Sequence, residues 1–111
     1  MEIYLIELPK TNGHEQHGVR PALVISKPIK QIAIVMPFTS NMTALRFPYT
    51  LKVEPSKENG LSFPSVLLIF QIRAIDSKRL VKKLGVLEDV YRNQVIESLK
   101  KILNLSGSHS D

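Results

Sequence analysis

The segment RPALVISKPIKQIAIVMPF, Arg20–Phe38, is the most informative about the fold, because two apolar runs follow each other with only a short connection between them. The runs Arg20–Ser26 and Gln31–Phe38 are rich in β-branched residues, and this composition predicts two strands. EIYLIEL at Glu2–Leu8 has the same character and predicts a strand before them. Pro9–Gly18 is polar and contains proline, asparagine and glycine, which is typical of a loop.

Downstream of these runs the sequence continues to alternate between short apolar segments and turns. Tyr49–Val53 predicts a strand and Pro55–Gly60 a turn. Ser65–Gln71 is almost continuously apolar, as expected of a central strand that is buried on both faces. Arg73–Ile75 predicts a short strand, and Ser77–Leu84 predicts one or two helical turns.

The C-terminal segment Leu87–Leu105 predicts the clearest helix. Its apolar residues recur at helical spacing and form one stripe, made of Leu87, Val90, Tyr91, Val95, Leu99, Ile102 and Leu103. Several short strands followed by one helix predict a mainly β fold, a small bent sheet or barrel closed by a C-terminal helix. We expect a single domain over residues 1–105 and a disordered polar tail over residues 106–111.

Composition narrows the classes of function. The chain has 111 residues, a net charge of +5, a calculated pI of about 9.6 and no cysteine. A basic balance favours anionic partners, nucleic acid first. The absence of cysteine excludes disulfides and thiolate metal sites. No apolar run is long enough to span a bilayer, so we expect a cytoplasmic protein without a membrane partner.

The polar segment around Gly13–Pro21 is the most unusual part of the chain. It brings together two imidazoles, a carboxylate, an amide and a guanidinium, those of His14, Glu15, Gln16, His17 and Arg20. Composition alone is equally compatible with a solvated loop. The alternative is a metal-free phosphoryl-transfer site, in which a base activates a ribose 2′-hydroxyl and a cation stabilises the phosphorane. We expect no metal and no cofactor, because the two histidines have no clear third ligand.

Arg20 suits the cation role, since a guanidinium matches phosphate oxygens with two parallel donors and keeps its charge. It also lies where the predicted loop becomes a strand, so its backbone is expected to be held firmly. Thr39 and Ser40 follow another predicted strand and could donate hydrogen bonds from a neighbouring position. Ordinary hydrogen bonding at a strand end explains these two hydroxyls equally well.

The segment GHEQHGVRPALVIS at Gly13–Ser26 resembles the signature of the MazF/PemK (Kid) family of toxin ribonucleases. VMPFTS at Val35–Ser40 is similar to that family's third strand and the threonine that follows it. QIRAIDSKRL at Gln71–Leu80 resembles its closing strand and short helix, and the likeness runs in order from Glu2 to Leu105.

This resemblance implies an SH3-like small barrel with a C-terminal α-helix that works as a homodimer. It implies a toxin of a toxin–antitoxin system, an mRNA interferase that cleaves single-stranded RNA at short sequences without metal. The products would carry 2′,3′-cyclic phosphate and 5′-hydroxyl ends. It also implies a cognate antitoxin that binds the toxin and blocks its site.

The resemblance implies roles for individual residues. Arg20 would be the phosphate-binding catalytic residue, and Thr39 would assist as an acid or hydrogen-bond donor. Glu15 falls on a base of some family members, and His14 is a second candidate on chemical grounds. The residues expected to bind RNA are Gln16, His17, Ser40 and Gln71.

The chain also departs from the family pattern. The Kid-like branch uses an arginine and an aspartate on the strand that leads into the Gln-x-Arg phrase, and Leu68 and Phe70 stand there in this chain. This departure favours a mechanism centred on Arg20 and Thr39.

Two alternatives remain open from the sequence. Gyrase-poisoning toxins of the same fold rely on an aromatic C-terminal end with tryptophan, whereas this chain has no tryptophan and a polar tail. A non-catalytic RNA-binding barrel would need exposed aromatic residues on which bases stack. Apolar surroundings predict core positions for Tyr4, Phe38, Phe63 and Phe70, which leaves only Phe47 and Tyr49 as candidate base contacts.

Overall fold

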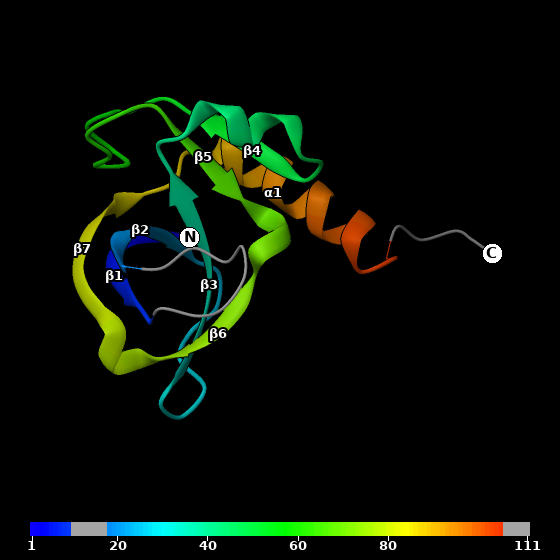
Figure 1. Ribbon diagram of the computed structural model, residues 1–111. Coiled ribbons are helices and arrows are strands. Elements are labelled where there is room, and N and C mark those ends of the chain that lie inside the picture. The colour runs from blue at the N-terminus through cyan, green and yellow to red at the C-terminus, as the bar shows by residue number, and fades with distance from the viewer. Residues whose placement is uncertain (10–17, 106–111) are drawn as a thin grey trace.

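The computed structural model describes residues 1–9 and 18–105, and these form a bent antiparallel sheet with one α-helix (Figure 1). Three short 3₁₀ helices interrupt the strands. The elements in chain order are β1 Glu2–Leu8, β2 Gly18–Val24, β3 Ile32–Thr39, η1 Met42–Arg46, β4 Thr50–Val53, β5 Ser65–Leu68, η2 Ile69–Gln71, β6 Arg73–Asp76, η3 Ser77–Arg79, β7 Leu80–Val86 and α1 Asp89–Ile102.

The strands follow the order β4-β5-β3-β2-β1-β7, and β6 pairs with the first half of β3. Strand β3 is long enough to pair with β2 and β6 along one part and with β5 at its end. As a result β1, β2, β3, β6 and β7 curl into a ring in Figure 1, while β4 and β5 extend from it beside α1. The predicted fold, a mainly β barrel with a C-terminal helix, is confirmed.

The core lies on both faces of strands β1–β3, which explains why their sequences read as nearly continuous apolar runs. Successive side chains of a strand point to opposite faces. On one face Ile3, Leu23 and Met36 pack with Val95 of α1. On the other face a second cluster fills the ring, made of Ile6, Leu8, Ala22, Val24, Ala33, Val35 and Ile75.

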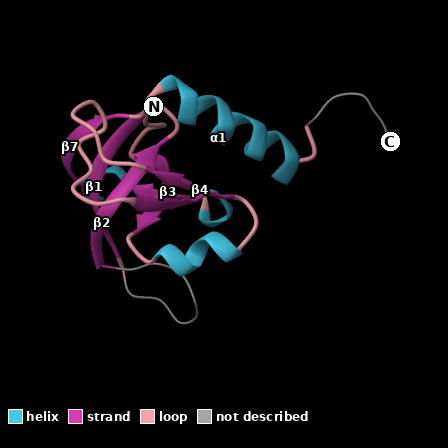
Figure 2. Ribbon diagram, turned by 90° about the horizontal axis from the view of Figure 1, so that it is seen from above, coloured by secondary structure: helices cyan, strands magenta, loops and turns pink. Residues whose placement is uncertain are grey.

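Helix α1 lies along one side of the sheet (Figure 2) and is shorter at both ends than the sequence predicts. Val95 is fully buried, and Tyr91, Leu99 and Ile102 are half-buried against the same core. Val90 is 64% exposed, because the contact stripe is narrower than the predicted one. Leu103 also lies outside the stripe. No helix among the described residues is long and apolar enough to cross a membrane.

The prediction of one strand over Ser65–Gln71 is wrong at its end. Strand β5 stops at Leu68 and the chain continues as η2. The partner strand β4 begins only at Thr50, since Tyr49 has a φ of 58° and turns the backbone away from the ladder. The N–H of Ile69 still donates to the carbonyl of Tyr49 at 3.1 Å. Beyond this bond the backbone closes a turn in which the N–H of Ile72 donates to the carbonyl of Ile69 at 3.2 Å.

The prediction of helical turns over Ser77–Leu84 is correct only for its start. Ser77–Arg79 form η3, which the Asp76 carboxylate caps by accepting a hydrogen bond from the N–H of Lys78 at 2.9 Å. Leu80–Val86 form strand β7 instead of a helix. The free edge of β1 explains the difference, because β7 pairs with it from Ile6↔Leu80 to Glu2↔Val86.

The loop between β4 and β5 is fixed by Asn59, which is fully buried. Its amide nitrogen donates to the carbonyl of Glu54 at 2.8 Å and to the carboxylate of Glu88 at 3.1 Å. Its amide oxygen accepts from the N–H groups of Ser56 and Leu61, both at 3.0 Å. Since every polar atom of this buried side chain is satisfied, the loop is held in one conformation.

Two glycines allow the same loop to approach β7 closely. Gly60 has a φ of 72°, and a Cβ there would overlap the backbone carbonyl of Leu84. A Cβ at Gly85 would likewise overlap the backbone of Glu58 and Asn59. The chain that follows Gly60 is therefore anchored against the sheet.

Candidate active site

Arg20 and Thr39 lie on neighbouring strands. Strands β2 and β3 are antiparallel with Ala22 opposite Pro37, and continuing this register would bring Arg20 opposite Thr39. The Arg20 guanidinium donates a hydrogen bond from Nη1 to the carbonyl oxygen of Phe38 at 3.3 Å. The strand pairing therefore brings together two side chains that stand nineteen positions apart in the sequence.

Both side chains line one hollow of about 450 Å³. Its walls come from β2, from the end of β3 and from the segment that follows Gly60. Its polar lining includes Arg20, Thr39, Ser40, Ser62 and Ser65. One guanidinium surrounded by hydroxyl groups suits an anion with several oxygens, such as a phosphate.

Arg20 is half-buried, and this burial lowers the pKa of its guanidinium below the ordinary value of arginine. The group is still charged at neutral pH, because arginine titrates far above it. Partial removal from water strengthens its attraction for an anion in the hollow, since the surrounding dielectric screens the charge less.

Thr39 and Ser40 have different surroundings although they are adjacent. Thr39 is 8% exposed, and its Oγ1 accepts a hydrogen bond from the N–H of Asn41 at 3.2 Å. That contact fixes the oxygen and leaves the hydroxyl hydrogen available for donation. Ser40 is exposed at the rim of the same hollow.

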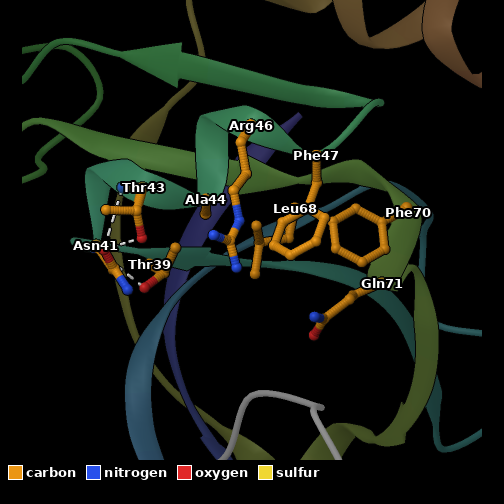
Figure 3. A pocket seen from close by; sticks show the side chains of 9 residues that line it. All are labelled: Thr39, Asn41, Thr43, Ala44, Arg46, Phe47, Leu68, Phe70 and Gln71. Carbon is orange, nitrogen blue, oxygen red and sulfur yellow. Dashed lines mark hydrogen bonds between the residues drawn. The ribbon is translucent and has the colours of Figure 1, made fainter.

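A second hollow of about 500 Å³ meets the first at Thr39 (Figure 3). It is bordered by η1 and η2, and its rings belong to Phe47 and Phe70, with centroids 5.9 Å apart and planes inclined at 49°. The Arg46 guanidinium lies 5.0 Å from the centre of the Phe47 ring. Gln71 is half-buried at the side of this hollow away from Thr39.

Expectations from sequence about the aromatic residues are partly wrong. Phe38 is buried, and Phe47 and Tyr49 are exposed, as predicted. Tyr4 was expected in the core and is only half-buried, packed against the cluster inside the ring. Phe63 and Phe70 were expected in the core, but they are 68% and 41% exposed. Both lie just outside β5, whose four residues are all buried, so the burial of that strand does not extend to them.

The other predicted site residues, His14, Glu15, Gln16 and His17, lie outside the described residues. The ends of the segment that contains them are described, and Leu8 of β1 pairs with Gly18 of β2. Over residues 1–9 and 18–105, no three His, Cys, Asp or Glu side chains gather closely enough to hold a metal ion.

Arg46, Leu68 and Phe70 could not be singled out as a group from the sequence. Their proximity depends on the contact of η1 with β5 and on the contact of the Phe47 ring with that of Phe70 in η2. The only signal in the sequence was the departure from the Kid-like pattern at Leu68 and Phe70. Leu68 is buried and Phe70 borders the second hollow, so apolar side chains stand there in place of charged ones.

A bent antiparallel sheet with one C-terminal helix and a basic hollow at its edge defines a small β-barrel protein suited to a polyanion. The match to a family model is more specific. Residues 1–103 match the model of the PemK-like, MazF-like toxin of type II toxin-antitoxin systems, and the chain belongs to that family.

Individual relatives agree with this assignment. The chain is 35% identical over 108 residues to the endoribonuclease EndoA of Bacillus subtilis (strain 168), covering 94% of this chain and 92% of that protein. The crystal structure of MazF from Deinococcus radiodurans (Form-I) superposes with a TM-score of 0.75 at 26% identity, covering 93% of each chain. The MazE–MazF structure from the same organism (Form-II) has a TM-score of 0.69 at 27% identity, covering 95% of this chain and 94% of that one.

Proposed function

We propose that this chain is a toxin that cleaves single-stranded RNA without metal at the hollow containing Arg20 and Thr39. Membership of the toxin family and the likeness to an endoribonuclease make the chain an endoribonuclease toxin. The observation that carries the assignment of the site is that Arg20, Thr39 and Ser40 line the same hollow.

Arg20 would bind the scissile phosphate. In this reaction the ribose 2′-oxygen forms a bond to phosphorus and the bond from phosphorus to the 5′-oxygen breaks, which leaves a 2′,3′-cyclic phosphate and a 5′-hydroxyl. Negative charge increases on the non-bridging oxygens as the 2′-oxygen attacks. A half-buried guanidinium that is already hydrogen-bonded to Phe38 needs little reorganisation to stabilise that charge.

Thr39 would supply a hydrogen bond or a proton to the leaving 5′-oxygen. The N–H of Asn41 holds its Oγ1 in place, which supports this assignment because a fixed donor loses less entropy in the transition state. Ser40, exposed at the rim, would bind the RNA.

The base that takes the proton from the 2′-hydroxyl would be Glu15 or His14. The two alternatives differ in pH dependence. A carboxylate with an ordinary pKa stays deprotonated down to about pH 5, whereas an imidazole is protonated below about pH 6.5. If His14 is the base, the cleavage rate falls as the pH decreases from 8 to 5. A flat profile over this range, in both wild-type protein and a His14→Ala variant, would assign the role to Glu15.

Gln16, His17 and Gln71 would position the substrate. Gln71 borders the aromatic hollow beside Thr39, where Phe47 and Phe70 offer rings to nucleobases. Leu68 and Phe70 carry no charge, so this hollow would recognise bases and leave phosphate chemistry to the first. This division supports a mechanism centred on Arg20 and Thr39.

We expect two protein partners. The Deinococcus MazF has also been solved as a MazE–MazF structure, and we expect a cognate antitoxin for this chain. We also expect a homodimer, as the family resemblance implies. The proposed substrate of the toxin, mRNA, is found in the cytoplasm, and this supports a cytoplasmic location for the protein.

The experiment that tests this proposal incubates the protein with a long single-stranded RNA in excess EDTA, beside an Arg20→Ala variant. We expect discrete cuts by the wild-type protein and none by the variant. The 5′ fragments should resist ligation at their 3′ ends, because ligation requires a free 3′-hydroxyl. Acid treatment should open their 2′,3′-cyclic phosphate.

Other outcomes would change the assignment. RNA that is bound but not cut by folded wild-type protein, over several unrelated long RNAs, would indicate a binding barrel. Cutting that needs added metal would contradict the metal-free mechanism. Cutting that survives Arg20→Ala would leave the activity intact and overturn the site.

A further inference from the structure

Phe63 is the most exposed large apolar side chain of the described residues, at 68%. It stands in the segment between the loop anchored by Asn59 and the start of β5. Single exposed apolar residues are common on protein surfaces, so exposure alone assigns no role to it. What distinguishes Phe63 is how firmly it is held and what lies beside it.

The backbone around Phe63 is fixed on both sides. Pro64 follows it and restricts Phe63 to extended conformations. The hydroxyl of Ser65, which is 6% exposed, donates to the carbonyl of Phe63 at 2.9 Å. On the other side Leu61 is buried, and its N–H donates to Asn59 at 3.0 Å. The ring is therefore presented to solvent by a rigid segment, which is the arrangement expected of a binding platform.

Phe63 also separates two hollows. It lines the hollow of about 450 Å³ that contains Arg20 and Thr39. It also lines a smaller one of about 350 Å³ together with Ser40, Met42 and Pro64. Met42 is half-buried and packs on a buried cluster of Ala44, Val66 and Leu68, so this second wall is fixed as well.

We propose that the hollow formed by Ser40, Met42, Phe63 and Pro64 binds the nucleobase next to the scissile phosphate, with the base stacked on Phe63. This inference rests on the proposed function. The phosphate and base of one nucleotide are joined through a ribose, so a phosphate site must have its base site directly beside it. Ser40 borders both hollows, which makes them neighbours.

The chemistry of the hollow fits a base. Three of its four lining side chains are apolar, and one is an aromatic ring. Stacking on such a ring is open to every base, because all of them have a π face. The hydroxyl of Ser40 is the one side-chain group there that can bond to a base edge. The subsite therefore contributes affinity and register more than sequence discrimination.

The test compares three substitutions of Phe63 on an RNA that carries a cut site mapped with the wild-type protein. Phe63→Ala removes the ring, Phe63→Leu keeps apolar bulk without a π face, and Phe63→Tyr keeps the ring. Val90→Ala is the matched control, because Val90 is 64% exposed on α1.

We expect Phe63→Ala to raise KM by about 5- to 100-fold, the range of one lost base stack, with kcat changed by less than about threefold. Phe63→Tyr should retain the wild-type KM, and Phe63→Leu should resemble Phe63→Ala. Val90→Ala should match the wild-type protein. A KM for Phe63→Ala equal to that of the wild-type protein would overturn the proposal.

Abasic substitution identifies the base itself. One RNA position flanking the cut, when made abasic, should raise KM for the wild-type protein as much as Phe63→Ala does. The two changes together should add nothing further, since both remove the same contact. If the effects of Phe63→Ala and of the abasic substitution on KM multiplied at every RNA position, stacking on Phe63 would be contradicted.

The same variants separate this inference from the proposed function. A wild-type protein that cuts no RNA would refute the proposed function, and this subsite with it. Wild-type cutting that Phe63→Ala leaves unchanged would refute the subsite alone. If Phe63→Ala weakened binding of a protein partner while KM for RNA stayed constant, the hollow would be a protein-docking site and the proposal would be wrong.

Discussion

The two hollows that meet at Thr39 each contain one arginine, and the two arginines differ in their surroundings. Arg20 is half-buried on β2 and donates to the carbonyl of Phe38 at 3.3 Å. Arg46 is exposed on η1, and its guanidinium lies 5.0 Å from the centre of the Phe47 ring. The same side chain is thus placed for two different uses.

The guanidinium groups of Arg20 and Arg46 differ in their burial and in their hydrogen bonding. A partly desolvated guanidinium interacts strongly with a phosphate, whereas an exposed one is screened by water and salt. The contact of Arg46 with an aromatic ring orients it beside a surface suited to bases. The two hollows share the buried Thr39, and under the proposed function the reaction would take place in one and base recognition in the other.

Substitution of Arg20 should have the largest effect. Arg20→Ala removes the cation at the phosphate, and we expect the cleavage rate at saturating RNA to fall by about 10²- to 10³-fold. Arg20→Lys should give an intermediate rate, because a lysine keeps the charge but not the two parallel donors. Single-turnover cleavage measures both. Arg92→Ala, an exposed arginine of α1, is the control and should cleave at the wild-type rate.

Thr39 should show the next largest effect. Thr39→Val removes the hydroxyl at nearly constant volume, and we expect kcat to fall by about 10- to 100-fold, as for the loss of a hydrogen bond to a charged group. Thr39→Ser keeps the hydroxyl and should retain most of the rate. Equal rates for the valine and serine variants would show that the hydroxyl does not take part.

Phe47 should affect recognition and leave the reaction itself intact. Phe47→Ala removes one of the two rings of the second hollow, and we expect KM to rise by about 5- to 100-fold at nearly constant kcat. Steady-state kinetics on the mapped cut site gives both constants. A loss confined to kcat would place Phe47 with the reacting groups and contradict the assignment of the second hollow to base recognition.

Arg46 should have the smallest effect. Arg46→Ala removes an exposed cation, and we expect KM to rise only about two- to fivefold at unchanged kcat. If Arg46 also contacts a phosphate, the slope of log affinity against log salt concentration should become shallower by about one. Binding of RNA measured at several salt concentrations checks this. A large fall in kcat would contradict the division between the two arginines.

Much of the fold could be predicted from the sequence, because β1, β2, β3 and α1 have periodic or continuous apolar patterns. Strand β7 could not, since LVKKLGV at Leu80–Val86 has no strong alternation and its conformation depends on pairing with the edge of β1. The end of β5 at Leu68 depends likewise on where its partner β4 begins.

The candidate site shows the same limit. Arg20 and Thr39 could be named from the resemblance to a family, but their common hollow results from the pairing of β2 with β3. Phe63 and Phe70 were expected in the core because apolar neighbours surround them in sequence. Whether such a residue is buried depends on where β5 begins and ends, and no local sequence pattern reveals these two points.

The most direct test of the central claim is the single-turnover cleavage rate of Arg20→Ala and Arg46→Ala, at saturating RNA in excess EDTA. Both variants lose one arginine and one positive charge, so general electrostatics affects them alike. We predict that Arg20→Ala cleaves about 10²- to 10³-fold more slowly than the wild-type protein, while Arg46→Ala cleaves at the wild-type rate. Equal rates for the two variants, with both folded, would contradict the assignment of the reaction to the hollow of Arg20.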